Sequence, residues 1–405
     1  MTSSLAWLDF SERDQRRARE IIQLFLQPES RDELGVGTVR DAISDLLFPG
    51  ISVIQTRARY FLFVPWLFKE GARRGKRGRE LLNWVDNWQR RHVETLRQSG
   101  AVDGLIGRIA GARVKILPST IYWHALQRFD ILRVGGAQEF VAAIDLKRVA
   151  LEDALQEESN RAEGVWQRNI PPVPVGFPDV QDLNFDLTED EADWLSERLQ
   201  DSTAGTPLAW LASRSECPTS SWPWSESLFQ DAPTSMRALL GHSEMFSLAM
   251  HGAALLYNLL LARRWEELKY ERAQEYIAHY EGLLESWGDE ISSRQKTLHM
   301  WNRSDMWGLV HLQNGRIKPQ TRTFIDTWCD CGVLSNPKMA LEKPALAQLI
   351  AQRERDQKKG QARLANDRLM SQWGGSSGSG RLAYRWDRVR TILTDIAKGR
   401  SHATS

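Results

Sequence analysis

Residues 243–264 read SEMFSLAMHGAALLYNLLLARR, and this stretch decides the fold class of the chain. It is rich in Leu, Ala and Met, which favour a helix. Few of its residues are charged, so a helix built from it must be buried on most of its surface. The stretch therefore predicts a long helix at the centre of a helical core.

Other segments extend the helical pattern outward from this stretch. Residues 61–68 (FLFVPWLF) are the most apolar in the chain and must also be buried. In residues 80–97, Leu81, Val85, Trp88, His92 and Leu96 share one face at helical spacing. Only residues 114–117 and 132–134 suggest short strands. We therefore expect a mainly α, multi-helical protein with two or three helical subdomains.

Two segments interrupt the helical pattern. Residues 170–178 (IPPVPVGFP) cannot form a helix and mark a domain boundary. Residues 374–380 (GGSSGSG) have the composition of a flexible linker. The predicted divisions are an N-terminal helical domain with a basic block at 1–168, an acidic, irregular Pro/Trp-rich connecting segment at 169–235, a C-terminal helical domain at 236–373, a Gly/Ser linker at 374–380, and a docking basic helix with its tail at 381–405.

The composition suits a folded protein of more than one domain. The chain has 405 residues, of which 42% are hydrophobic and 26% charged. No run of about 18–20 apolar residues predicts a membrane span. Residues 1–7 (MTSSLAW) lack the features of a signal peptide, so we expect a cytoplasmic protein without membrane contact. Its three cysteines cannot form a disulfide framework.

The small net charge of +1 conceals three charged blocks. Residues 69–115 carry 12 basic and 5 acidic residues, residues 178–235 carry 2 basic and 12 acidic residues, and residues 341–400 carry 13 basic and 6 acidic residues. This asymmetry favours a polyanionic partner such as DNA, internal docking of acidic on basic parts, or both. The candidate phosphate-binding residues are Arg73, Arg74, Lys76, Arg77 and Arg79 in the first block, and Arg385, Arg388 and Arg390 in the last.

Tryptophan is unusually frequent, with 17 copies. Most of these residues are expected to anchor the core, because tryptophan buries a large apolar area. A few exposed copies would serve as platforms on which nucleobases stack.

Motifs of known enzymes are absent or out of place. The chain has no Walker loop, no HExxH, no GxGxxG and no set of kinase motifs. A GxSxG match at residues 374–378 lies in the Gly/Ser segment without a preceding strand, so it does not predict a hydrolase nucleophile. Cys329 and Cys331 lack the two further ligands of a structural zinc site. We therefore expect no cofactor, no metal and no catalytic site.

One pattern leaves nuclease chemistry open. Asp130, Asp145 and Lys147 resemble the two carboxylates and the lysine with which metal-dependent nucleases hold Mg²⁺ and position water. That chemistry needs a strand at residues 140–147. The segment instead continues as an Ala/Leu/Glu-rich helix, in which Asp145 and Lys147 point to different faces.

Three stretches carry a family resemblance, namely residues 4–10 (SLAWLDF), 34–42 (LGVGTVRDA) and 54–60 (IQTRARY). They resemble a family of bacterial proteins that is defined only by a domain of unknown function. The resemblance is strongest over the first ~130 residues. It implies a genomic context beside helicase and phospholipase-D-like genes in phage-defence islands. It implies no catalytic residue.

Three functional hypotheses follow from these patterns. The leading one is a non-enzymatic, helical, nucleic-acid-associated component of a bacterial multi-protein system for phage defence, with DNA and other proteins of that system as partners. The second is a protein–protein interaction scaffold without nucleic-acid binding. The third is a divergent metal-dependent nuclease or hydrolase.

Overall fold

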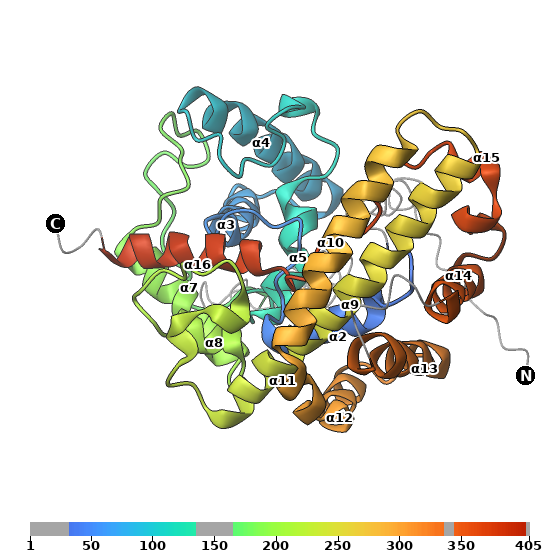
Figure 1. Cartoon of the computed structure of the whole chain (residues 1–405). Helices are drawn as coiled ribbons and strands as arrows, with labels where there is room; N and C mark the ends of the chain where they lie inside the picture. Colours follow the sequence, from blue (N-terminus) through green and yellow to red (C-terminus); the bar gives the residue numbers. More distant parts are fainter. Residues whose placement is uncertain (1–31, 135–164, 336–343, 402–405) are drawn as a thin grey trace, which may run out of the picture. The chain divides into compact units, whose positions relative to one another are not determined.

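The computed structural model describes residues 32–134, 165–335 and 344–401 (Figure 1). These residues form 14 α-helices joined by short 3₁₀ turns, and no β-strand is found among them. The predicted mainly α, multi-helical class is confirmed. The two short strands are not formed. Residues 114–117 are irregular, and Leu132 makes only an isolated bridge to Trp166.

The contacts within the chain define two units, each assembled from segments that are distant in sequence. Among the described residues, unit 1 contains 47–134, 165–232 and 385–401. Unit 2 contains 32–46, 233–335 and 344–384. The predicted domain boundaries were drawn along the chain and stay a prediction.

Unit 1 is built around a buried aromatic helix. Its helices are α3 (Tyr60–Arg73), α4 (Gly78–Gln98), η2 (Gly111–Arg113), α5 (Pro118–Arg128), α7 (Glu189–Ser202), α8 (Pro207–Ala212), η4 (Pro223–Ser225), η5 (Ser227–Phe229) and α16 (Trp386–Ser401). Every residue from Tyr60 to Phe68 is buried, as expected for the most apolar stretch of the sequence. The ring of Phe61 packs edge-on against Tyr122 and Phe129 of the adjacent α5 segment.

The C-terminal helix α16 docks within unit 1 by the apolar stripe that its sequence shows. Val389, Leu393 and Ile396 are buried, and the helix packs against α7 and α8. Gly399 permits the close approach to α7, because a Cβ at this position would lie 2.7 Å from Cβ of Ala192. The apolar stripe of α16 is therefore covered by its own chain.

Unit 2 is organised by a pair of long helices, α9 and α10, that run side by side (Figure 1). Its elements are α9 (Thr234–Glu267), α10 (Ala273–Ser293), α11 (Gln295–Met300), α12 (Arg303–Gln313), α13 (Pro319–Trp328), the π-helix η6 (Cys329–Leu334), α14 (Pro344–Lys358), η8 (Lys359–Gln361), η9 (Arg363–Ala365), α15 (Asp367–Met370) and most of α2 (Gly37–Leu47). The helix predicted over 243–264 lies inside α9. Gly252 lets the pair approach closely, because its Cβ would lie 2.3 Å from the ring of Trp287.

By length and composition, α9 could span a membrane, and it is the one described helix that passes this test. The expected absence of membrane contact stays a prediction. Within unit 2, however, 83% of its most apolar window is buried, as in the core helix of a folded domain.

A buried polar network joins three distant segments of unit 2. The carboxylate of Glu33 accepts hydrogen bonds from Arg363 Nη1 at 2.9 Å and from Ser377 Oγ at 2.7 Å. The backbone of Ser377 also exchanges two hydrogen bonds with the side-chain amide of Asn258 on α9, at 2.8 and 2.9 Å. These contacts fix the middle of the Gly/Ser segment 374–380 within unit 2.

Candidate nucleic-acid interface

The first basic block of the sequence forms a continuous part of unit 1. It spans the end of α3, the turn at residues 74–77, α4 and the loop that contains η2, and α4 contacts both α3 and η2. Gly75 adopts a left-handed φ of 78° in the turn, which glycine adopts without steric strain. Positive charge that is clustered in sequence is therefore also clustered in space.

Two of the predicted residues share one carboxylate. Arg73 Nε lies 2.7 Å from Glu70 Oε2, and Arg74 Nε lies 2.7 Å from Glu70 Oε1. The hydrogen bond from Arg73 lowers the pKa of Glu70 more than burial raises it, and Arg74 lowers it further. Since two guanidinium groups face one carboxylate, the cluster keeps a net charge of +1 at the surface.

The other three predicted residues of the turn differ in their partners. Lys76 pairs with Glu80, so its charge is balanced. Arg77 donates to the carbonyl oxygens of Ala72 and Lys76, both at 2.8 Å, and keeps its full charge. Arg79 is exposed and has no ion pair or hydrogen bond among the described residues.

Two neighbouring tryptophan side chains of α4 lie in a row with an arginine at each end. The rings of Trp84 and Trp88 are 5.9 Å apart. The guanidinium of Arg74 lies 5.8 Å from the Trp84 ring, and that of Arg91 lies 4.8 Å from the Trp88 ring. Both indoles are half-buried, and neither indole N–H has a hydrogen-bond partner in the described part of the chain. This row combines flat apolar surface with cations, as nucleic-acid-binding surfaces do.

This row was not predicted from the sequence. The spacing placed Trp88 on the apolar face of α4 with Leu81, Val85, His92 and Leu96, but Trp88 is half-buried whereas the other four are buried. The signal was present in the spacing of Trp84, Trp88 and Arg91, which are four and three residues apart and therefore neighbours on a helix. Whether that row faces the core or the solvent depends on where α3 lies, and this is not readable from α4 alone.

The loop after α4 adds three exposed cations, Arg108, Arg113 and Lys115. None of them has a carboxylate partner among the described residues. We define the α4 basic face by eight exposed or half-exposed cations around α4. Its members are Arg73, Arg74, Arg77, Arg79, Arg91, Arg108, Arg113 and Lys115.

The second predicted group lies at the start of α16 and contacts backbone carbonyl oxygens of unit 1. Arg385 Nη1 donates to Ile51 at 2.7 Å, Arg388 Nε donates to Val53 at 3.0 Å, and Arg390 Nη1 donates to Ser220 at 2.9 Å. These bonds hold the first turns of α16 in place. Their role in phosphate binding stays a prediction.

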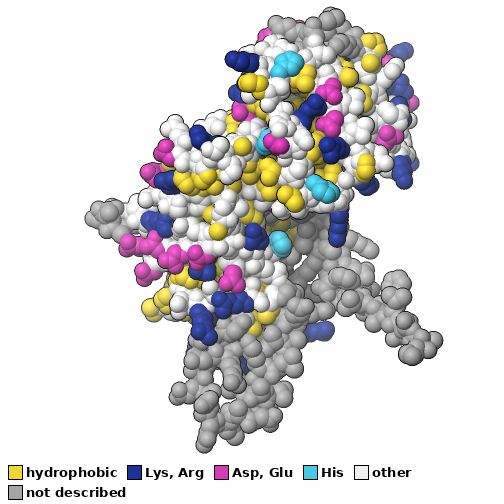
Figure 2. All heavy atoms as spheres, turned by 90° about the horizontal axis from the view of Figure 1, so that it is seen from below, with side chains coloured by type: hydrophobic (Ala, Val, Ile, Leu, Met, Phe, Trp, Pro, Cys, Tyr) yellow, Lys and Arg dark blue, Asp and Glu magenta, His cyan; other side chains and the backbone are white. Residues whose placement is uncertain are grey.

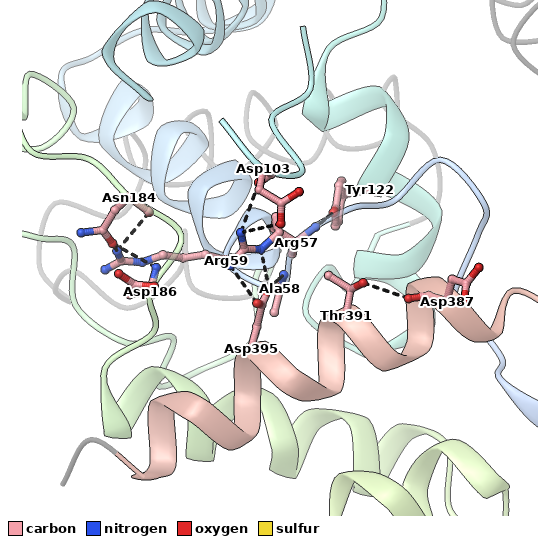
Figure 3. A network of polar contacts seen from close by, with 10 residues as sticks. All are labelled: Arg57, Ala58, Arg59, Asp103, Tyr122, Asn184, Asp186, Asp387, Thr391 and Asp395. Carbon is pink, nitrogen blue, oxygen red and sulfur yellow. Dashed lines mark hydrogen bonds and ion pairs between the residues drawn. The ribbon is translucent and has the colours of Figure 1, made fainter. Parts of the chain in front are cut away.

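A buried ion-pair network anchors the middle of α16 (Figure 3). Asp395 accepts from Arg57 Nε and Nη2 and from the backbone N–H of Ala58, each at 2.9 Å. Burial alone would lower the pKa of Arg57, but the hydrogen bonds and charge of Asp395 raise it. Burial raises the pKa of Asp395, and the hydrogen bonds and charge of Arg57 oppose this rise. Beside this pair, Arg59 Nη2 contacts Glu191 at 3.0 Å.

The acidic middle segment faces α16 rather than standing free. Arg400 Nε lies 2.7 Å from Asp193 on α7 and also donates to the carbonyl oxygens of Ala212 and Arg214. Glu191 is buried against Arg59 and completes the capping box at Thr188. The acidic block therefore docks the last basic helix through specific contacts.

Tryptophan exposure is limited throughout the described chain. All 16 described tryptophans are buried or half-buried, so none is a freely exposed platform. On the face shown in Figure 2, Lys and Arg side chains are interspersed with acidic and hydrophobic ones. Half-buried tryptophans beside arginine, such as Trp84 and Trp88, are the aromatic surface that remains for a ligand.

The nuclease pattern stays a prediction, because two of its three residues lie outside the described chain. Asp130 is exposed and lies 3.5 Å from Arg133, and Asp145 and Lys147 lie outside the described residues. Burial raises the pKa of the Cys329 thiol to about 12, so this cysteine is not a nucleophile at neutral pH. Among residues 32–134, 165–335 and 344–401, no three His, Cys, Asp or Glu side chains are placed to hold a metal ion.

Comparison with known proteins yields one match. The model of a family of unknown function (DUF6361) matches residues 2–399 of the chain. No curated protein and no solved structure matches. The resemblance to a family of unknown function, expected from three N-terminal stretches, is confirmed over nearly the whole length.

Proposed function

We propose that this chain, which belongs to the family of unknown function DUF6361, is a non-enzymatic, helical DNA-associated protein that binds phosphates through the α4 basic face. The observation that carries the proposal is the surplus of unpaired cations there. Arg79, Arg108, Arg113 and Lys115 are exposed without a carboxylate partner among the described residues. Its place in a bacterial multi-protein defence system stays a prediction.

The chemistry of the face supports phosphate binding without sequence preference. Arginine donates paired N–H groups that match phosphate oxygens, and such contacts position a protein without reading bases. Trp84 and Trp88 add apolar edges with indole donors that have no partner among the described residues. Each phosphate that is neutralised releases condensed counterions, so affinity must fall as salt rises.

The test is fluorescence anisotropy of labelled single- and double-stranded DNA at low and near-physiological salt. The variant replaces Arg79, Arg113 and Lys115 by Ala, because none of the three holds an ion pair that folding needs. We expect weaker binding and a slope of log K against log salt that is shallower by about 2–3, from a contribution of about 0.9 per phosphate contact.

A matched control removes the same charge elsewhere. Lys296, Arg316 and Lys318 in unit 2 are also exposed without ion pairs in the described chain, and their replacement by Ala should leave the salt slope unchanged. An equal loss of affinity in both triple variants would show a general charge effect and contradict the assignment of the face. If the wild-type chain binds DNA at neither salt concentration, DNA association is refuted.

The two other hypotheses stay predictions with distinct signatures. A scaffold would capture protein partners in a salt-insensitive manner. The apolar stripe of α16 is not available for this while it is docked on α7 and α8. A nuclease would cleave nucleic acid with Mg²⁺ and would lose this activity on Asp145→Ala.

A further inference from the structure

The loop that follows α4 is held in one conformation by its own backbone. Gly107 and Gly111 adopt left-handed φ values of 88° and 58°. The N–H of Gly111 donates to the carbonyl oxygen of Gly107 at 2.7 Å, and the N–H of Val114 donates to that of Gly111 at 3.0 Å. These bonds close a tight turn whose tip is formed by residues 108–110.

Two side chains of α4 brace this turn. Arg90 Nη1 donates to the carbonyl oxygens of Ala112 and Val114, at 2.8 and 2.5 Å. Glu94 Oε1 accepts from the N–H of Ala112 at 2.9 Å. The tip therefore keeps a defined position relative to α4 and its basic face.

The tip presents one large apolar side chain to solvent. Ile109 is 93% exposed, although its neighbours Leu105 and Ile106 are buried in unit 1. The same loop carries the exposed cations Arg108, Arg113 and Lys115, and none of them pairs with a carboxylate among the described residues. An exposed isoleucine on a braced turn, in a loop that also carries three unpaired cations, is poorly suited to water and well suited to a polyanion with an apolar interior.

We propose that Ile109 is an apolar wedge that inserts between base pairs of duplex DNA from the minor groove, while Arg108, Arg113 and Lys115 contact the flanking phosphates. The proposal rests on the proposed function, because it uses the same ligand class and the same face. Isoleucine is among the side chains that such wedges use, and the stacked bases provide the apolar surroundings that Ile109 lacks in the free protein. A braced tip favours insertion, because little conformational freedom is lost on binding.

A membrane is the less suitable occupant. Stable attachment to a lipid surface needs a broad apolar face or several inserted side chains. The tip carries a single large exposed apolar side chain, Ile109, between Arg108 and Ala110. One wedge residue is sufficient to unstack a base step.

The experiment uses the full chain and a duplex of about 30 base pairs labelled at both ends, with anisotropy for affinity and energy transfer for bending. Insertion should kink the duplex by about 20–90° and raise energy transfer. Ile109→Ala should weaken binding about 50-fold, from the loss of three buried carbons, and should abolish most of the rise in energy transfer. The salt slope should not change, because every cation remains.

Val175→Ala is the matched control, because Val175 is 100% exposed but lies in the proline-rich segment 170–178. It should match the wild type in affinity and bending. If the wild-type chain binds no duplex, both the wedge and the proposed function are refuted. If Ile109→Ala binds and bends DNA like the wild type, only the wedge is refuted. If the wild type binds phosphatidylserine vesicles, and Ile109→Ala loses that binding but still binds DNA, the DNA wedge is refuted and Ile109 contacts a lipid surface instead.

Discussion

Replacing Asp395 by Asn tests whether a buried ion pair stabilises the packing of the C-terminal helix α16 within unit 1. The carboxylate accepts three hydrogen bonds, two from the guanidinium of Arg57 and one from the N–H of Ala58. Asn keeps the shape and can accept some of these bonds, but it removes the charge. Arg57 then retains the more distant carboxylates of Asp103, at 3.9 Å, and of Asp186.

The magnitude follows from burial. The side chain of Asp395 is 6% exposed and that of Arg57 is 17% exposed. Removing one partner of a buried pair costs about 3–5 kcal/mol, because the other charge remains without compensation. Arg57 is partly solvated and Asn still accepts hydrogen bonds, so we expect the free energy of unfolding to fall by about 2–3 kcal/mol. For a unit of this size the melting temperature should fall by about 4–12 °C.

Urea denaturation followed by tryptophan fluorescence measures this loss. Asp387→Asn is the control, because Asp387 lies on the same helix but is exposed (Figure 3). It should change the free energy of unfolding by only about 0.5 kcal/mol. Equal effects of Asp395→Asn and Asp387→Asn would refute this stabilising role of the ion pair. So would a double-mutant cycle with Arg57→Gln in which the two losses simply add, since residues in direct contact should couple.

Three further predictions test burial and packing. Burial lowers the pKa of His92 below 6.5, so on acidification the unfolded chain binds a proton at this residue before the folded chain does. The free energy of unfolding should therefore fall between pH 7 and 5. In urea titrations, His92→Gln should make this fall smaller. Gly252→Ala should lower the free energy of unfolding by about 1–3 kcal/mol, because the added Cβ would overlap the Trp287 ring. Gly241→Ala lies on the same helix with open space around it and should raise the free energy of unfolding by about 0.5–1 kcal/mol. Calorimetry of the two variants and the wild type measures both changes. Burial alone would raise the pKa of Glu33, but its hydrogen bonds and neighbouring cations lower it. In the same urea titrations, Glu33→Gln should be less stable than the wild type at pH 7. It should also lose less stability than the wild type on acidification below about pH 4.5.

Each of these predictions has a contradicting outcome. An unchanged pH profile in His92→Gln would show that this imidazole titrates alike in both states. A more stable Gly252→Ala would mean that the helix pair separates without loss. If Glu33→Gln lost as much stability as the wild type on acidification, the Glu33 carboxylate would contribute nothing to acid unfolding.

Local patterns predicted the fold class and left its assembly open. The helix over 243–264 and the apolar stretch 61–68 were predicted correctly, because residue type and periodicity act over a few neighbouring positions. The two short strands were not formed, because β-pairing needs a partner strand that no local pattern supplies. The hydropathy of α9 likewise shows only that this helix must be buried, and does not show whether a protein core or a membrane surrounds it.

For the candidate site, the sequence by itself determined where the charges lie along the chain, and only the tertiary structure decided which of them are free. Arg57 and Arg385 look equivalent in sequence, yet one meets Asp395 across 338 positions and the other binds the carbonyl of Ile51. Trp88 was predicted on the apolar face of its helix but is half-buried beside Trp84, and Ile109 is exposed although Leu105 and Ile106 are buried. Charge and periodicity are properties of the chain, whereas pairing and exposure depend on which distant segments meet when it folds.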